Sequence, residues 1–133
     1  MILVFGSNLK GIHGAGAAAY AYSKFGAVWG QGEGLQGESY ALPTCSEPGV
    51  PLDLKAIEHY VDQFLGFASD NPQLQFQVTA VGCGIAGYKP QQIALLFFKK
   101  SLPDNVWTPA QFYRALFWEG YREGKEEAKH GSR

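Results

Sequence analysis

The chain has 133 residues, 46% of them hydrophobic and 17% charged, which fits one folded domain and excludes both a disordered chain and two separate domains. Its formal net charge of -1 provides no basic face that could follow a phosphate backbone, so we do not expect nucleic acid as a main partner. No apolar run reaches the roughly 18 residues that span a bilayer, so we also expect no membrane partner.

The first part of the chain predicts two strands and one helix. Residues 1–7 form an apolar strand that we expect at the centre of a sheet, because both of its faces are apolar. A helix should run from about Gly14 to Phe25, with Gly26 as its C-terminal stop. The glycine-punctuated stretch 27–38 predicts an irregular loop, and the strand that follows, 39–43, should end at its proline.

The middle of the chain contains the clearest helical pattern. Its apolar residues keep alternating spacings of three and four, which predicts one buried stripe that Asp70-Asn71-Pro72 should end. The stripe consists of Leu54, Ile57, Val61, Phe64 and Ala68. After it we expect a strand over Gln75–Val81 and a helix from Pro90 to about Lys100.

The last part predicts a short strand at 105–107 and a final helix. Thr108-Pro109-Ala110-Gln111 has the pattern of a capping box with proline at the first helical position. We expect one domain over residues 1–121 and a charged C-terminal tail over 122–133. Strands that alternate with helices at these intervals predict an α/β protein with a mostly parallel sheet, whose ligands bind beyond the carboxyl ends of the strands.

Two glycine-rich turns give the strongest functional signal. The first runs through Gly6-Ser7-Asn8 and His13–Ala17, between the first strand and the first helix. The second, Gly82–Tyr88, lies between the strand at Gln75–Val81 and the helix that starts at Pro90. Such turns expose backbone N–H groups that can hold a diphosphate without charged side chains. The structural alternative is that each turn only makes a tight strand–helix junction.

Three short motifs, in this order, resemble the macro domains. They are His-Gly-Ala-Gly-Ala-Ala followed by Lys-Phe-Gly within 13–26, Tyr-Ala-Leu-Pro at 40–43, and Val-Gly-Cys-Gly-Ile at 81–85. The similarity covers roughly residues 1–100 and is closest to the divergent branch that removes terminal ADP-ribose from proteins. The resemblance implies a three-layer α/β/α sandwich with a mostly parallel mixed sheet. It also implies that ADP-ribose or a related NAD-derived nucleotide binds between the two turns.

The resemblance further implies which residues face this ligand. Gly14–Ala17 would face the ribose and the diphosphate, Gly82–Tyr88 would hold the diphosphate from the other side, and Phe5–Asn8 would lie under the adenosine or the distal ribose. The expected ligand-binding set is Phe5, Gly6, Ser7, Asn8, Gly14, Ala15, Gly16, Ala17, Gly82, Cys83, Gly84, Ile85, Ala86, Gly87 and Tyr88. ADP-ribosylated protein is a further partner that the resemblance suggests.

The chain departs from that branch at both of its catalytic groups. Ala86 stands at the position of the catalytic aspartate, and Thr44 and Cys45 stand where the branch has its lysine. The Asn-Ala-Ala-Asn signature of commoner macro domains is also absent, unless Asn8 stands in for its last asparagine. The enzymatic activity of the branch is therefore not carried over to this chain.

Two residues at the first turn are candidates for chemistry of another kind. His13 is expected at the lip of the turn, where it can act as a general acid or base, and Asn8 can hold an attacking water. With these catalytic residues the chain would be an ADP-ribosyl hydrolase or an ADP-ribose-1″-phosphate phosphatase. Glu33 and Glu38 are weaker candidates in a stretch that could fold over a ligand. The structural alternatives are an exposed loop histidine and solvated carboxylates.

Two other functions stay open. One is a non-catalytic module that only recognises ADP-ribose. The other is a Rossmann-like nucleotide phosphoribohydrolase, although the chain lacks the Pro-Gly-Gly-x-Gly-Thr-x-x-Glu motif of those enzymes.

The cysteines and histidines bear on location and on metals. The start of the chain shows no signal-peptide pattern, so we expect a cytoplasmic protein in which Cys45 and Cys83 are reduced thiols. Cys83 is expected to be a small buried filler at a strand end. No histidine falls in a metal-ligand spacing, so we expect neither a metal nor a cofactor.

Overall fold

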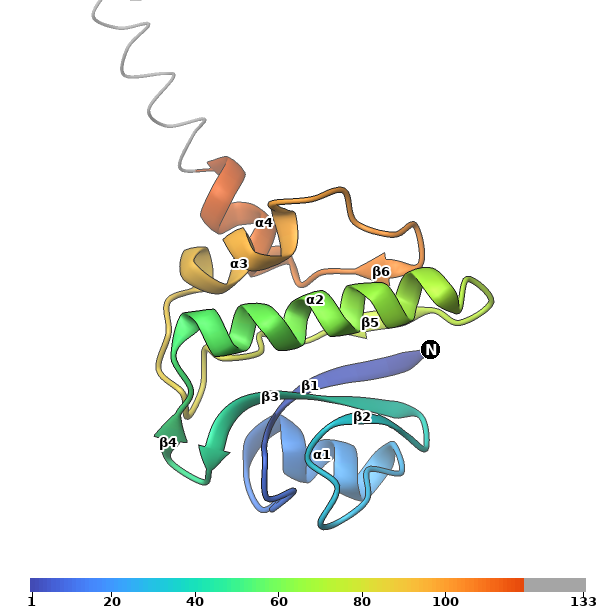
Figure 1. Cartoon of the computed structure of the whole chain (residues 1–133), viewed down its shortest axis with the longest axis vertical. Helices are drawn as coiled ribbons and strands as arrows, with labels where there is room; N and C mark the ends of the chain where they lie inside the picture. The colour runs from blue at the N-terminus through green and yellow to red at the C-terminus, as the bar shows by residue number, and fades with distance from the viewer. Residues whose placement is uncertain (119–133) are drawn as a thin grey trace, which may run out of the picture.

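A six-stranded sheet organises residues 1–118, which are the residues that the computed structural model describes (Figure 1). Its strands are β1 (Ile2–Asn8), β2 (Gly34–Gln36), β3 (Ser39–Glu47), β4 (Val50–Pro51), β5 (Phe76–Val78) and β6 (Val106–Trp107). The strand order is β2-β3-β1-β5-β6, and β4 pairs with β3. The pairs β1–β3, β1–β5 and β5–β6 are parallel, whereas β2 and β4 run antiparallel to β3. A mostly parallel mixed sheet is therefore confirmed.

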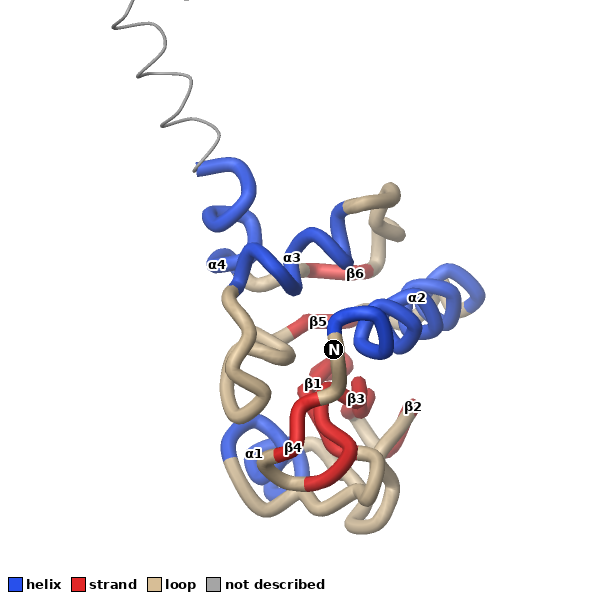
Figure 2. Tube along the Cα trace, turned by 60° about the vertical axis from the view of Figure 1, so that its left-hand side comes forward, coloured by secondary structure: helices blue, strands red, loops and turns tan. Residues whose placement is uncertain are grey.

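Helices pack on both sides of the central strands. They are α1 (Gly16–Lys24), α2 (Leu54–Asp70), α3 (Pro90–Phe98) and α4 (Ala110–Tyr113), which a π-helical segment (Arg114–Trp118) continues. Figure 1 and Figure 2 agree in placing α1 and α2 on opposite sides of β1 and β3. None of the helices within residues 1–118 combines the length and the hydrophobicity needed to cross a bilayer. The charged tail expected over 122–133 lies outside the described residues.

The larger hydrophobic core lies between the sheet and α2, α3 and α4. Val4 of β1 faces it, and the stripe predicted for α2 is buried there, except that Leu54 is only partly buried and Leu65 joins instead. The core is filled by aromatic rings in edge-to-face or tilted contact, which include Tyr40, Phe64, Phe76, Phe97 and Phe112. Burial of such large rings is the main stabilising contribution to the fold.

The smaller core lies under α1, on the other face of β1. Successive side chains of a strand point to opposite faces, so Phe5 points away from the side that Val4 faces. Phe5 packs there with four alanines, namely Ala18 and Ala21 of α1, Ala27 and Ala41. These small residues let α1 lie close to the sheet, which places the start of α1 beside the end of β1.

Strand β3 is longer than the sequence predicts. The proline was expected to end the strand, but β3 continues through Pro43 to Glu47. Pro43 is tolerated because β2 pairs only with residues 39–41 of β3, so the missing N–H of Pro43 breaks no ladder on that side. Beyond it, the chain turns at Pro48 and Gly49 into the short strand β4, which pairs with the end of β3.

Strand β5 is shorter than predicted, and helix α4 begins without the predicted cap. Strand β5 ends at Val78. The N–H of Thr79 still donates to Val4 O of β1, but the N–H of Val81 donates back to Thr79 O, and this local hydrogen bond turns the chain away from the sheet. Helix α4 begins at Ala110, with Pro109 as its N-cap and no side-chain cap. The predicted capping box at Thr108 is therefore wrong, whereas the predicted strand near 105–107 is confirmed as β6.

Candidate functional site

A cavity of about 660 Å³ opens where β1, β3 and β5 end. Its volume lies within the range of small-molecule sites, roughly 300–1,000 Å³. Both glycine turns contribute to its wall, so the structure brings together the two segments that the sequence singled out. The lining residues are Gly6, Ser7, Asn8, Ile12, Gly14, Ala15, Gly16, Ala17, Ala18, Thr44, Cys45, Pro48, Gly49, Thr79, Ala80, Val81, Gly82, Cys83, Gly84, Ile85, Ala86 and Gln111.

The first turn is held in shape by Asn8. Its Nδ2 donates to Ile12 O (2.9 Å), and Ile12 N–H donates to its Oδ1 (3.1 Å), so the amide bridges the loop from both ends. Gly11 N–H also donates to Asn8 O (2.9 Å). Asn8 is buried but still lines the cavity. Its observed role is to shape the loop that leads to α1.

The start of α1 presents free backbone donors to the cavity. Ala15, its N-cap, makes no side-chain cap, and the first turn carries no acidic residue. The first N–H groups of a helix have no acceptor within it, so those of Gly16, Ala17 and Ala18 stay available. By contrast, α2 is capped by Asp53, whose Oδ1 accepts from Ala56 N–H (2.8 Å). An uncapped N-terminus with its positive dipole end is suited to an anion.

The second turn presents a further set of donors. Its internal hydrogen bonds are donated by the N–H groups of Cys83, Gly87 and Tyr88. The N–H groups of Gly84–Ala86 find no protein acceptor within residues 1–118. The turn requires glycine at Gly82, which has a φ of 75° and where a Cβ would lie 2.8 Å from Ile93 Cδ1.

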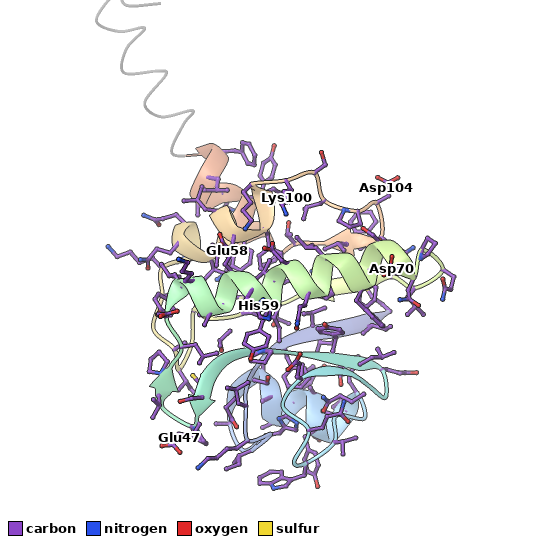
Figure 3. The ribbon with its side chains drawn as sticks, in the orientation of Figure 1. Glu47, Glu58, His59, Asp70, Lys100 and Asp104 are labelled. Atoms are coloured by element: carbon purple, nitrogen blue, oxygen red, sulfur yellow. The ribbon has the colours of Figure 1, made fainter. Side chains whose placement is uncertain are left out.

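Within residues 1–118, the residues that line the cavity carry no carboxylate, imidazole, amine or guanidinium group. Figure 3 shows Glu47 at the outer end of β3, where it forms an ion pair with Lys10 (2.7 Å) and does not line the cavity. Burial raises the pKa of both cavity cysteines, Cys45 and Cys83, and the neighbouring Thr44 hydroxyl acts in the opposite direction on the pKa of Cys45. Both thiols are therefore protonated at neutral pH. Among the described residues, no three metal-ligating side chains come together.

His13 does not lie at the lip of the turn, where the sequence analysis placed it. The side chain is buried, does not line the cavity, and lies edge-on to Phe5 with 5.3 Å between ring centroids. Its Nε2 donates to Gln31 O (3.0 Å), because a carbonyl oxygen can only accept. The imidazole thus joins the first turn to the loop that follows α1.

Three members of the expected ligand-binding set do not line the cavity either. Phe5 is fully buried in the smaller core. Tyr88 packs against the larger core, and its hydroxyl donates to Leu52 O (2.5 Å), so the ring closes the turn and does not cover a ligand. Gly87 is outside the lining as well, whereas every other member of the set is part of it.

The glycine-rich stretch 27–38 has a structural explanation. It packs against the end of β1, and a Cβ at Gly32 would clash with the carbonyl oxygen of Asn8. Ser7 Oγ donates to Gly32 O from the other side of this contact. Glu33 and Glu38 are exposed and do not line the cavity, so the stretch does not fold over it.

Several lining residues were not expected. Ligands of α/β proteins bind beyond the carboxyl ends of the parallel strands, and this rule, applied to every such strand end, could have found four of them. They are Thr44, Cys45, Thr79 and Ala80. Pro48 and Gly49 come from the turn between β3 and β4. Gln111 reaches the cavity from α4, and no local pattern in the sequence signals that approach.

Searches of protein families, of curated proteins and of solved structures find no match for the chain.

Proposed function

We propose that the chain is a macro-like domain, a three-layer α/β/α sandwich, that binds ADP-ribose or a related NAD-derived nucleotide in this cavity. One observation carries the proposal. Two separate sets of backbone N–H groups without an acceptor among residues 1–118, those of Gly16–Ala18 and those of Gly84–Ala86, border the same cavity. Such sets bind the oxygens of a phosphate or diphosphate.

The chemistry of the lining favours a nucleotide over a simple inorganic anion. The walls between the two sets of donors are formed mainly by small and apolar residues. A sugar ring can pack against such walls, whereas an inorganic ion would find no charged side chain there. Ser7 and Thr44 already use their hydroxyl protons on backbone carbonyls, and each oxygen retains the ability to accept from a ribose hydroxyl. A terminal ADP-ribose on a protein carries the same groups.

Recognition without hydrolysis is the function that the lining supports best. Hydrolysis of an ADP-ribosyl bond or a phosphate ester needs a positioned general acid or base whose pKa lies near the working pH. The lining has none, its thiols are protonated, and His13 is buried behind the turn. We therefore expect ADP-ribose binding without turnover of ADP-ribosylated protein or of ADP-ribose 1″-phosphate.

A valine at Gly84 tests the placement of the ligand. Gly84 lines the cavity, its φ is not positive, and a Cβ there meets no atom within 4 Å, so Gly84→Val should fold. Its side chain would occupy the space beside the free N–H groups. We expect titration calorimetry to show at least a tenfold rise in the Kd for ADP-ribose, about 1.4 kcal/mol.

Gly66 supplies the matched control for this variant. It lies on α2, it is exposed, its φ is not positive and a Cβ meets no atom within 4 Å. Gly66→Val should bind ADP-ribose with the Kd of the unmodified chain. Unchanged binding by a folded Gly84→Val would show that the second turn does not contact the ligand, and absence of binding by the unmodified chain would refute the proposed function.

A further inference from the structure

Two large aromatic side chains lie exposed beside the α1 end of the cavity. The side chain of Trp29, which follows α1, is 53% exposed, and Tyr22 on α1 is 49% exposed. Their rings meet edge-to-face with 5.5 Å between centroids. We call these two residues the aromatic rim. Exposed aromatic rings gathered at one place are a common mark of a binding surface.

The loop that carries Trp29 is fixed by hydrogen bonds to two neighbouring segments. Its hydrogen bonds join it to the first turn and to β2. They run from Val28 N to Gln36 Oε1 (2.7 Å), from Gly30 N to Gly11 O (2.8 Å) and from His13 Nε2 to Gln31 O (3.0 Å). The buried His13 ring also contacts Trp29 edge-on, with 6.4 Å between centroids. The aromatic rim is therefore held in place before any ligand arrives, which lowers the entropic cost of binding.

The rim is continuous with the cavity. Gly14 lines the cavity, and a Cβ on it would lie 3.8 Å from Cη2 of Trp29. Tyr22 follows Ala18, another lining residue, by one helical turn, so the two share a face of α1. From Gly16 to Tyr22 the helix rises about 9 Å, and the side chain leans back toward the N-terminus. The ribose of a nucleotide can bridge that separation.

We propose that Trp29 and Tyr22 form a base-stacking subsite for the nucleotide whose diphosphate lies in the cavity. This inference rests on the proposed function. Within residues 1–118 the cavity lining contains no aromatic side chain, and the two aromatic residues of the expected ligand-binding set, Phe5 and Tyr88, are packed in the cores. A base at the α1 end of the cavity can stack on the aromatic rim, which adjoins the lining at Gly14. Stacking on an uncharged aromatic face favours the larger purine ring over a pyrimidine.

Calorimetry with two nucleotides that differ in the base tests the subsite. The unmodified chain should bind ADP more tightly than UDP. In Trp29→Ala the Kd for ADP and for ADP-ribose should rise about tenfold, which lies in the range for loss of one stacking partner, and the preference for ADP over UDP should disappear. Tyr22→Ala should shift the same values in the same direction, and it places a good helix former on α1.

Trp107 provides a matched control and a second readout. It lies on β6, is also 53% exposed and does not line the cavity, so Trp107→Ala should bind ADP with the original Kd. Of the three tryptophans, Trp29 alone is left when Trp107 and Trp118 are replaced by phenylalanine, and ADP should quench its fluorescence.

Three outcomes decide the inference. A raised Kd for ADP in Trp29→Ala, with quenching of Trp29, supports it. An unchanged Kd in Trp29→Ala, or no quenching while ADP-ribose binds, overturns the subsite and leaves the proposed function standing. If the unmodified chain binds neither ADP-ribose nor ADP, the proposed function fails and the subsite fails with it.

Discussion

Tyr40 shows how burial governs the ionisation of single residues in this chain. It lies on β3 with 6% of its surface exposed, and its ring centroid is 5.0 Å from that of Phe64. Burial, and secondarily the negative charge of Glu33, raises the pKa of Tyr40 to about 12. Ionisation of the phenol is less favourable in the folded core than in the unfolded chain, so the free energy of unfolding should decrease at alkaline pH.

We expect the free energy of unfolding to fall between about pH 10 and 12. Below the unfolded pKa of about 10, Tyr40 is neutral in both states, and its contribution to stability is complete. As the pH rises toward the folded pKa of about 12, only the unfolded chain ionises, and stability is lost by about 1.4 kcal/mol per pH unit. Urea unfolding of the unmodified chain and of Tyr40→Phe, at pH 8 and pH 11, measures this loss. Equal losses in both proteins would contradict the assignment.

At the scale of elements, α1 lacks the stabilising N-terminal cap that α2 has. Asp53 caps α2, whereas Ala15 at the equivalent position of α1 has the extended backbone of an N-cap (φ −150°) but no oxygen to accept from the first turn. An aspartate or serine there would stabilise the helix by about 1 kcal/mol. The uncapped helix is understandable if a ligand supplies the missing acceptor.

The variant Ala15→Asp should therefore separate stability from binding. We expect chemical denaturation to show a gain of about 1 kcal/mol, because the carboxylate accepts from the first N–H groups of α1. Calorimetry should show a weaker affinity for ADP-ribose, since the same carboxylate occupies these donors and repels the diphosphate. Ala15→Ser, which caps without charge, should lose less affinity. A more stable Ala15→Asp with unchanged affinity would show that the ligand does not use the start of α1.

The sequence predicts elements well where one local pattern decides the structure. The alternating spacing that includes Ile57, Val61 and Phe64 specifies the buried face of α2, and the two glycine turns at parallel strand ends predict that they meet at one cavity. Prediction fails where a distant segment decides. Pro43 fits within β3 because the pairing with β2 extends no further than Ala41, and the extent of that pairing depends on two segments at once.

Side chains in the site follow the same division. The small residues of the turns line the cavity as predicted, because in a tight turn little but backbone is left to expose. His13 was not placed correctly, since the loop after α1 covers it, and Gln111 was not expected at the site at all, since it arrives from α4, far along the chain from the first turn. Spacing alone contains no information on either contact.

At the scale of the whole molecule, the two cores are unequal. The larger one fully buries the rings of Phe64, Phe76, Phe97 and Phe112, whereas the smaller one holds Phe5 and four alanines. Because stabilisation follows the apolar area buried, the contacts that hold α1 are weaker than those that hold α2. A nine-residue helix is also too short to persist without its tertiary contacts. The end of α1 that lines the cavity thus belongs to the less stable part of the fold.

Hydrogen exchange of the native protein should resolve this difference. We expect the amides within α1 to exchange through local openings of lower free energy than those within α2, which should open only with global unfolding. ADP-ribose should slow exchange in α1 and in the second turn, because bound phosphate fixes their N–H groups, and should slow the α2 amides only by the amount that binding adds to the free energy of global unfolding. Equal protection of both helices would show that α1 is not the less stable element. No response of α1 to ADP-ribose well above its Kd would show that the start of α1 does not contact the ligand.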